Sequence, residues 1–167
     1  MKTIIFITLV LFFFSGFARQ ESLQMTPREQ ETAKKEIREI VNVIFQSLEK
    51  MSAEALFQSY SNTHDFMFLT TDGSMMGLQE AKNHHVAWFN SLSSLKVTTM
   101  KEEFRFLPGN IVICGWQGEF KMTIGSGQQL KIDKFGITFI FSKTDNQWKV
   151  IHQHSSALPP VPEVPKS

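Results

Sequence analysis

Apolar side chains recur every three or four positions in the first third of the chain, which is the period of one helix face. The stripe is formed by Ile37, Ile40, Val41, Ile44, Phe45 and Leu48. Charged residues fill the positions between them, so we expect a long amphipathic helix with one buried face. Thr26, Pro27 and Glu29 precede the stripe and read as a capping box with proline at the first helical position.

Two shorter helices and a small hairpin are expected next. Ser52 can cap a helix over 53–60, and apolar spacing predicts another helix from about 78 to 91. Between them, the segment FMFLTTDGSMMG reads as a hairpin that turns at Asp72 and Gly73.

After position 96 the pattern changes to the alternation of strands. The predicted strands cover 96–107, 111–124, 128–142 and 147–156, separated by the turn sequences PGN, GSG and KTDN. Such long strands must twist and bend, and Gly115, Gly118 and Gly136 are expected bulge positions. Helices first and strands last indicate an α+β fold, a cone-shaped curved antiparallel sheet wrapped around the long N-terminal helix.

The first residues read as a secretory signal. Lys2 is followed by an apolar run from Ile4 to Phe14 and then by Gly16-Phe17-Ala18. The run is shorter than the roughly 20 residues of a membrane-spanning helix, although a retained N-terminal anchor is the alternative. The expected division is a signal peptide over 1–18, a flexible lead over 19–30, one domain over 31–157 and a mobile proline-rich tail over 158–167.

The charge balance argues against nucleic acid and membrane partners, and the cysteine content excludes an internal disulfide. Without Lys2 the chain has 16 basic and 16 acidic residues, so nucleic acid and, after signal removal, membranes are not expected partners. The single Cys114 has no cysteine to pair with and is expected to be a small buried side chain.

The closing strand carries the most specific pattern, W-x-V-x-H-x-H-x-S from Trp148 to Ser156. Together with the helices, hairpin and meander, it resembles the nuclear transport factor 2-like superfamily, in particular its SnoaL-like branch, over about Glu31 to Ala157. The stretch QWKVIHQHSSALPPVP is also similar to the closing strand of the calcium/calmodulin-dependent protein kinase II association domain. The resemblance implies a cystatin-like α+β barrel, a pocket between sheet and helices, and a homodimer through the sheet. It implies no particular reaction, because the superfamily includes isomerases, cyclases, dehydratases and proteins without known activity.

Strand alternation places Trp148, Val150, His152 and His154 on one face, which we expect to face the interior. Two histidines at this spacing lie about 7 Å apart and could hold a metal. A site needs a third ligand, and no further donor stands at a recognisable spacing, so we expect neither metal nor cofactor.

The candidate ligand-binding residues are Tyr60, His64, Phe68, Trp88, Trp116, Phe139, His152 and His154. The aromatic members are core residues in the simplest interpretation, and as a group they suggest a small apolar ligand. In isomerases and cyclases of the resembling superfamily a carboxylate moves a proton next to a carbonyl. Asp65 or His154 could be such a base, with Tyr60 as a donor to an oxyanion.

Two functions therefore follow from the sequence. The preferred one is an exported binding domain for a small apolar molecule of unknown identity. The alternative is a proton-transfer enzyme of steroid-isomerase or polyketide-cyclase type acting on a small apolar carbonyl compound. A homodimer through the sheet is expected in either case, because Phe104, Phe106, Val112 and Phe120 are expected on an outer face that needs covering.

The signal sequence generates a direct prediction. N-terminal sequencing of secreted or periplasmic material should begin near Arg19, because cleavage is expected after Ala18. Recovery of an intact Met1 on a membrane-embedded species would contradict export.

Overall fold

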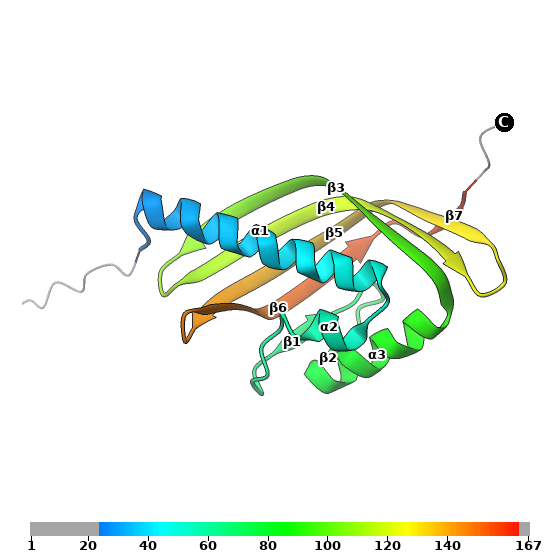
Figure 1. Cartoon of the computed structure of the whole chain (residues 1–167), viewed down its shortest axis with the longest axis horizontal. Coiled ribbons are helices and arrows are strands. Elements are labelled where there is room, and N and C mark those ends of the chain that lie inside the picture. Colours follow the sequence, from blue (N-terminus) through cyan, green and yellow to red (C-terminus); the bar gives the residue numbers. More distant parts are fainter. Residues whose placement is uncertain (1–23, 164–167) are drawn as a thin grey trace, which may run out of the picture.

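The computed structural model describes residues 24–163, so the expected signal and the last four residues lie outside the described part. The elements, in chain order (Figure 1), are α1 (Pro27–Glu49), α2 (Ala53–Phe57), β1 (Met67–Leu69), β2 (Met75–Met76), α3 (Leu78–Asn90), β3 (Leu92–Leu107), β4 (Ile111–Ile124), β5 (Gln129–Thr144), β6 (Gln147–Ala157) and β7 (Val161–Pro162). Among these residues no helix has the length and apolar character needed to cross a membrane.

The long helix begins where the sequence predicts. The hydroxyl of Thr26 accepts a hydrogen bond from the Glu29 backbone N–H at 3.3 Å, and the Glu29 carboxylate accepts one from the Thr26 backbone at 2.7 Å. This capping box satisfies donors at the helix start that no carbonyl can reach. Residues 27–30, expected in a flexible lead, therefore belong to α1.

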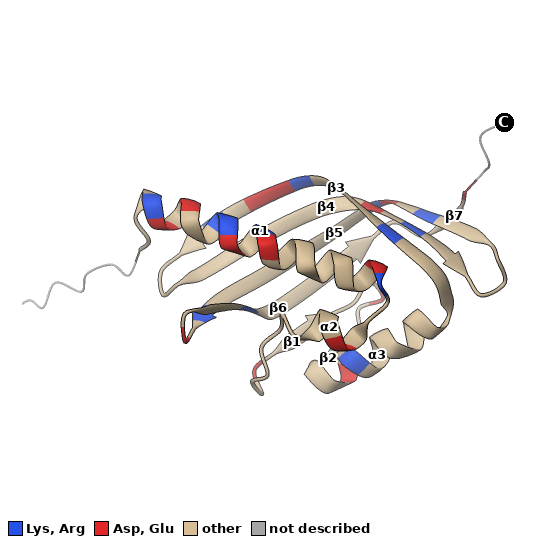
Figure 2. Cartoon of the chain, in the orientation of Figure 1, with Lys and Arg blue, Asp and Glu red and all other residues tan. Residues whose placement is uncertain are grey.

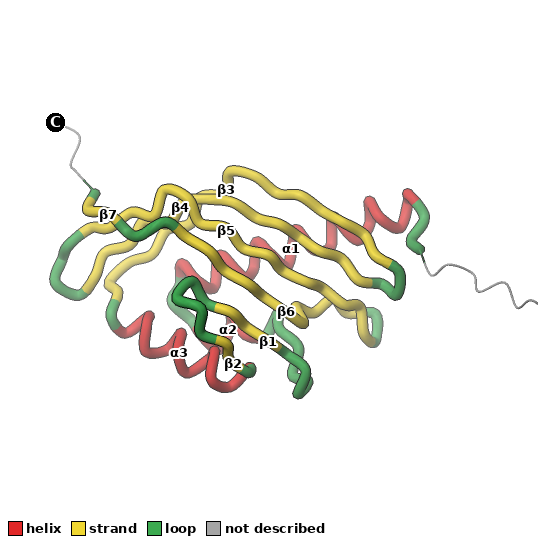
Figure 3. Tube along the Cα trace, turned by 180° about the vertical axis from the view of Figure 1, so that it is seen from behind, coloured by secondary structure: helices red, strands yellow, loops and turns green. Residues whose placement is uncertain are grey.

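The strands form one curved sheet that lies across α1 (Figures 1 and 3). Its order is β2-β1-β6-β5-β4-β3, with β3 to β6 as an antiparallel meander and β1 parallel to β6. The path ends at β2 and β3, so the sheet is not closed. The predicted α+β class, with a curved sheet around the N-terminal helix, is confirmed.

Turns between the long strands have the backbone that their sequences predict. Gly109 and Asn110 have positive φ between β3 and β4, Gly127 does between β4 and β5, and Asp145 and Asn146 do between β5 and β6. Glycine, asparagine and aspartate adopt this left-handed conformation with least cost.

One of the three expected bulge glycines lies at a bulge. The pairing of β4 with β5 shifts register between Gly118 and Phe120, whereas Gly115 and Gly136 lie in regular pairs. A Cβ on Gly118 would come within 2.3 Å of both the Thr98 carbonyl oxygen and the Trp116 ring. Glycine is needed there for close packing of the backbone against the indole.

The four residues expected on the outer face of the sheet lie on its helix side, so that expectation is wrong. Val112 and Phe120 are buried in the core, and Phe104 and Phe106 pack against it. The guanidinium of Arg38 on α1 lies 5.4 Å from the centroid of the Phe104 ring. Alternation shows which residues share a face, but it does not show which face meets the helix.

The C-terminal segment also departs from expectation. Val161 pairs with Lys131 as part of β7, and the Glu163 carboxylate lies 2.6 Å from the Lys121 ammonium. The described part of the proline-rich tail, up to Glu163, therefore follows the sheet.

Charged residues of both signs are mixed along α1 and β3 (Figure 2). Several form pairs between elements, such as Arg38 with Glu102 at 2.9 Å and Lys96 with Glu49 at 3.0 Å. This mixture agrees with the near-neutral composition and leaves the fold to depend on apolar packing.

Candidate functional site

A bulge in β6 decides which side chains enter the interior. Ile140 pairs with His152 and the next residue, Phe141, pairs with Val150, so Ile151 is an extra residue without an opposite partner. An extra residue reverses the alternation of the side chains that follow it. Trp148 and Val150 are buried on the inner face, as expected, whereas beyond the bulge the buried residues are Gln153 and Ser155.

The expectation that His152 and His154 point inward is therefore wrong. His154 is exposed and His152 is half-buried, both on the outer face of the sheet. The extra residue is an isoleucine within a regular strand pattern, and the local sequence gives no sign of the reversal.

The inner face of β6 instead contributes to a buried chain of hydrogen bonds. The Tyr60 hydroxyl donates to Gln153 Oε1 at 2.6 Å, and Gln153 Nε2 donates to Ser155 Oγ at 3.1 Å. Burial raises the pKa of Tyr60 well above its usual value, so the phenol stays protonated and is a donor. Sequence reasoning identified Tyr60 but missed Gln153 and Ser155, because alternation placed them outside.

A second buried polar group, His85, lies among aromatic rings. Its Nδ1 lies 2.8 Å from the Ala81 carbonyl oxygen, and its ring is 5.1 Å from that of Phe57 and 5.3 Å from that of Phe68. Burial lowers the pKa of His85 to about 4, so the imidazole is neutral near pH 7 and Nδ1–H donates to the carbonyl.

The aromatic residues expected to line an apolar pocket pack as core. Phe68, Trp116 and Phe139 are buried, and the Phe45 ring lies 4.4 Å from that of Trp116 and 6.4 Å from that of Phe139. Trp88 is half-buried and lies 5.9 Å from the His85 ring.

The two expected bases are at the surface and apart. Asp65 lies in the loop before β1, with 77% of its side chain exposed, and pairs with the exposed His64 at 2.7 Å. It lines an outer hollow of about 510 Å³ together with His152, whereas His154 lines a different hollow of about 240 Å³ above Gly115 and Gly136. The structure thus does not bring Asp65 and His154 together with Tyr60.

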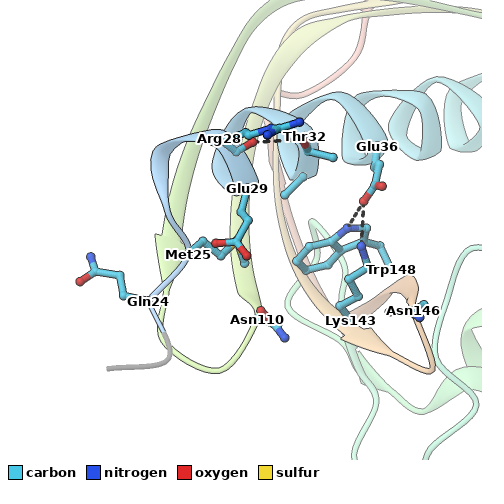
Figure 4. A pocket seen from close by; sticks show the side chains of 11 residues that line it. Gln24, Met25, Arg28, Glu29, Thr32, Glu36, Asn110, Lys143, Asn146 and Trp148 are labelled. Carbon is cyan, nitrogen blue, oxygen red and sulfur yellow. Dashed lines mark hydrogen bonds and ion pairs between the residues drawn. The ribbon is translucent and has the colours of Figure 1, made fainter. Parts of the chain in front are cut away.

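A cleft of about 470 Å³ lies at the other end of the fold, between the N-terminal half of α1 and the β3–β4 and β5–β6 turns (Figure 4). We call it the α1 cleft. Met25, Ala33 and Trp148 supply its apolar wall, and Asn110 and Asn146 lie at its rim. Four charged residues also line it: Arg28, Glu29, Glu36 and Lys143. Its volume is within the range of small-molecule sites, about 300–1,000 Å³.

Glu36 holds the wall of the α1 cleft together. Its Oε2 accepts a hydrogen bond from the Trp148 indole N–H at 2.8 Å and one from the Lys143 ammonium at 3.1 Å (Figure 4). The Lys143 ammonium also lies 5.4 Å from the Trp148 ring centroid. The hydrogen bonds from Lys143 and from Trp148 lower the pKa of Glu36, so this carboxylate is ionised near neutral pH.

The side chains that most often bind metals do not cluster among the described residues. Within 24–163, no three His, Cys, Asp or Glu side chains come together as a metal site. Cys114 is buried, as predicted, and burial raises the pKa of its thiol to about 12, so it is not a thiolate near pH 7.

Comparison with known proteins identifies a family and several structures with a similar fold. The model of a family described as a SnoaL-like domain matches residues 37–162. Among curated proteins no match to the chain is found. A nuclear transport factor 2-like superfamily protein of Salmonella enterica serovar Typhimurium superposes with a TM-score of 0.70 at 18% identity, covering 78% of this chain and 94% of its own.

Two further solved structures are similar in the same way. A Xanthomonas campestris protein named for the calcium/calmodulin-dependent protein kinase II association domain gives a TM-score of 0.65 at 19% identity, over 75% of this chain and 87% of its own. A hexachlorocyclohexane dehydrochlorinase of Novosphingobium barchaimii gives 0.70 at 12% identity, over 84% and 97%. At these identities the likeness concerns the fold and not the reaction.

The buried hydrogen-bond chain can be tested by removing one hydroxyl. Tyr60→Phe should lower the free energy of unfolding by about 1–3 kcal/mol, because Gln153 Oε1 is left buried without its donor. Urea unfolding followed by circular dichroism measures the change. The double variant Tyr60→Phe/Gln153→Leu should recover part of the loss, and an unchanged midpoint for Tyr60→Phe would show that water replaces the hydroxyl.

Proposed function

The chain belongs to the SnoaL-like domain family, and from this premise we propose that it is an exported small-molecule-binding domain. Its ligand occupies the α1 cleft, and two copies associate through the outer face of the sheet. Export rests on residues 1–18, where one basic residue precedes an apolar run and small residues.

The observation that carries the binding proposal is the composition of the α1 cleft. An indole, a thioether and a methyl group form one wall, and most of the other lining side chains are charged or amides. Binding sites for small molecules combine a mainly apolar wall with a few polar groups that set orientation. The α1 cleft is more polar than such a site usually is, so it suits a small ligand with one apolar face and several groups that pair with charged and amide side chains.

The chemistry of the same cleft favours binding over proton transfer. Efficient general bases have pKa values close to the working pH. Glu36 is the carboxylate beside Trp148, and its pKa is lowered by the hydrogen bonds that it accepts from Lys143 and Trp148. It is therefore a weak base, and Asp65 and His154 line other hollows.

Filling the α1 cleft should remove the ligand. Thr32 is exposed on α1 and lines the cleft, so Thr32→Trp places an indole across it. Native mass spectrometry of protein purified from its own cells should show a bound small molecule on the wild type. We expect Thr32→Trp to bind that molecule at least about tenfold more weakly, which corresponds to about 1.4 kcal/mol.

The matched control is Lys35→Trp, which adds the same side chain to an exposed position of the same helix outside the α1 cleft. It should bind the molecule as the wild type does. Equal retention by both variants would place the ligand elsewhere, and a wild type without any bound molecule would argue against the proposed function.

The dimer is proposed on a patch different from the one expected from sequence. Leu107, Ile111, Ile113 and Ile140 lie on the outer face of β3, β4 and β5, and we call them the outer apolar patch. Ile113 and Ile140 are direct neighbours across β4 and β5. A two-fold interface uses the same patch on both copies, so a continuous apolar strip on a sheet face suits it.

A charge in this patch should separate the copies. Light scattering at micromolar concentration should give a dimer mass for the wild type and a monomer mass for Ile113→Lys, because an ammonium would be buried without a partner. Val43→Lys is the control, since Val43 is 48% exposed on α1. A wild-type monomer at this concentration would contradict the proposed dimer.

A further inference from the structure

The reversal in β6 places three metal-binding side chains on the same outer face of the sheet. His152 and His154 both point outward beyond the bulge at Ile151. The short strand β1 runs parallel to β6 and pairs Met67 with His152 and Leu69 with His154. Met67 is therefore beside His152 and diagonal to His154, on the same face.

We propose that Met67, His152 and His154 form a binding site for a single copper(I) ion. The site is separate from the α1 cleft and does not rest on the function proposed for that cleft.

The strand geometry places the three donors within reach of one ion. Side chains at i and i+2 on one strand are about 7 Å apart, and neighbouring strands are about 4.8 Å apart. Met67 and His152 line one hollow and His154 lines another, so binding a common ion requires the His154 imidazole to turn toward β1, a reach that its length allows. The flexible methionine side chain needs no particular backbone angle to reach the ion.

The donor atoms are accessible to an ion from solvent. Met67 is 37% exposed and His154 is exposed. In His152 the Nδ1 atom is buried and has no hydrogen-bond partner among the described residues. Nε2 is therefore the His152 nitrogen that can bind an outside ligand.

The donor set selects the metal. Thioether sulfur is a soft ligand that favours copper(I), and imidazole binds copper as well. Zinc binds imidazole nitrogen, thiolate sulfur and carboxylate oxygen, so this donor set offers it two protein ligands, fewer than the three or four of zinc sites. Asp65, which lines the same hollow as Met67 and His152, is paired with His64 at 2.7 Å.

This site was not expected from the sequence for two reasons. Alternation directed the histidines inward, and a third ligand was sought among histidine and aspartate. Pairing β1 with β6 supplies a thioether 85 positions away along the chain, as the register of Met67 with His152 shows. The third ligand is therefore brought beside the histidines by strand pairing and is not part of a local sequence motif.

The site borders the outer apolar patch, because Ile140 of the patch lines one hollow with Met67 and His152. Ile140 of the patch is the neighbour of His152 on β5, opposite Met67 on β1. Copper binding and association are therefore measured separately, by metal titration and by light scattering. A monomeric wild type that binds copper would contradict the dimer alone.

The test is an anaerobic competition on the untagged mature chain, with ascorbate as reductant and the coloured copper(I)–bicinchoninate complex as the probe. The wild type should remove one equivalent of copper(I) from the complex. Loss of groups that only support metal ligands already weakens binding by about 10–100-fold, so Met67→Leu and His154→Gln should each weaken it by more than about tenfold.

Two substitutions of the same kind serve as controls. Met100→Leu changes a methionine that is 63% exposed on β3, and His84→Gln changes an exposed histidine on α3. Both should bind copper(I) as the wild type does. Melting temperatures of all four variants identify any effect that comes from unfolding.

X-ray absorption at the copper edge tests the ligands themselves, with two imidazole nitrogens and one sulfur expected. Failure of the wild type to compete for copper(I) would overturn the proposal. So would unchanged binding by Met67→Leu, because the two histidines would then act without the thioether.

Discussion

Packing of the apolar face of α1 against the concave side of the sheet is the contact on which the rest of the structure depends. Ile37, Val41 and Ile44 are at most 1% exposed, and Phe45 contacts the rings of Trp116 and Phe139 on the central strands. Because Cys114 is a free cysteine and no disulfide links the described residues, this packing is the main source of stability. The aromatic side chains that could have lined an interior cavity are used to form it. Space for a ligand is consequently found at the end of the helix and on the outer face of the sheet.

The single extra residue at Ile151 changes which side chains of β6 face the interior. Before it, Trp148 and Val150 contribute to the α1 cleft and the core, and beyond it Gln153 and Ser155 meet Tyr60 in the interior. Its position coincides with contacts from the segment before β1, since Val150 accepts a hydrogen bond from the Ser61 backbone and donates one to Ser59. Backbone pairing on this side of β6 thus accompanies the local irregularity, and the same side then accepts β1 in parallel.

Features determined by neighbouring residues were predictable from the sequence. The start of α1 follows from Thr26 and Glu29, and the turns at Asn110 and Asn146 follow from residues that tolerate positive φ. The face assignments beyond Ile151 were not predictable, because the bulge involves pairing with distant segments and isoleucine gives no signal of it. The same limit applies to Phe104 and Phe106, since a half-buried strand shows two alternating faces and only the position of α1 distinguishes them.

The last described strand has a consequence for where this domain ends. β6 pairs with β5 from Phe135 to Thr144, and β7 pairs with Leu130 and Lys131 farther along the same strand. The two short segments together act as one neighbour for nearly the whole of β5. A chain cut after Ala157 would leave the start of β5 with unpaired backbone groups on one side, and open strand edges recruit other strands. The segment after Ala157 therefore covers an open strand edge. A protein shortened to a boundary drawn from sequence composition alone would expose that edge to association with other chains.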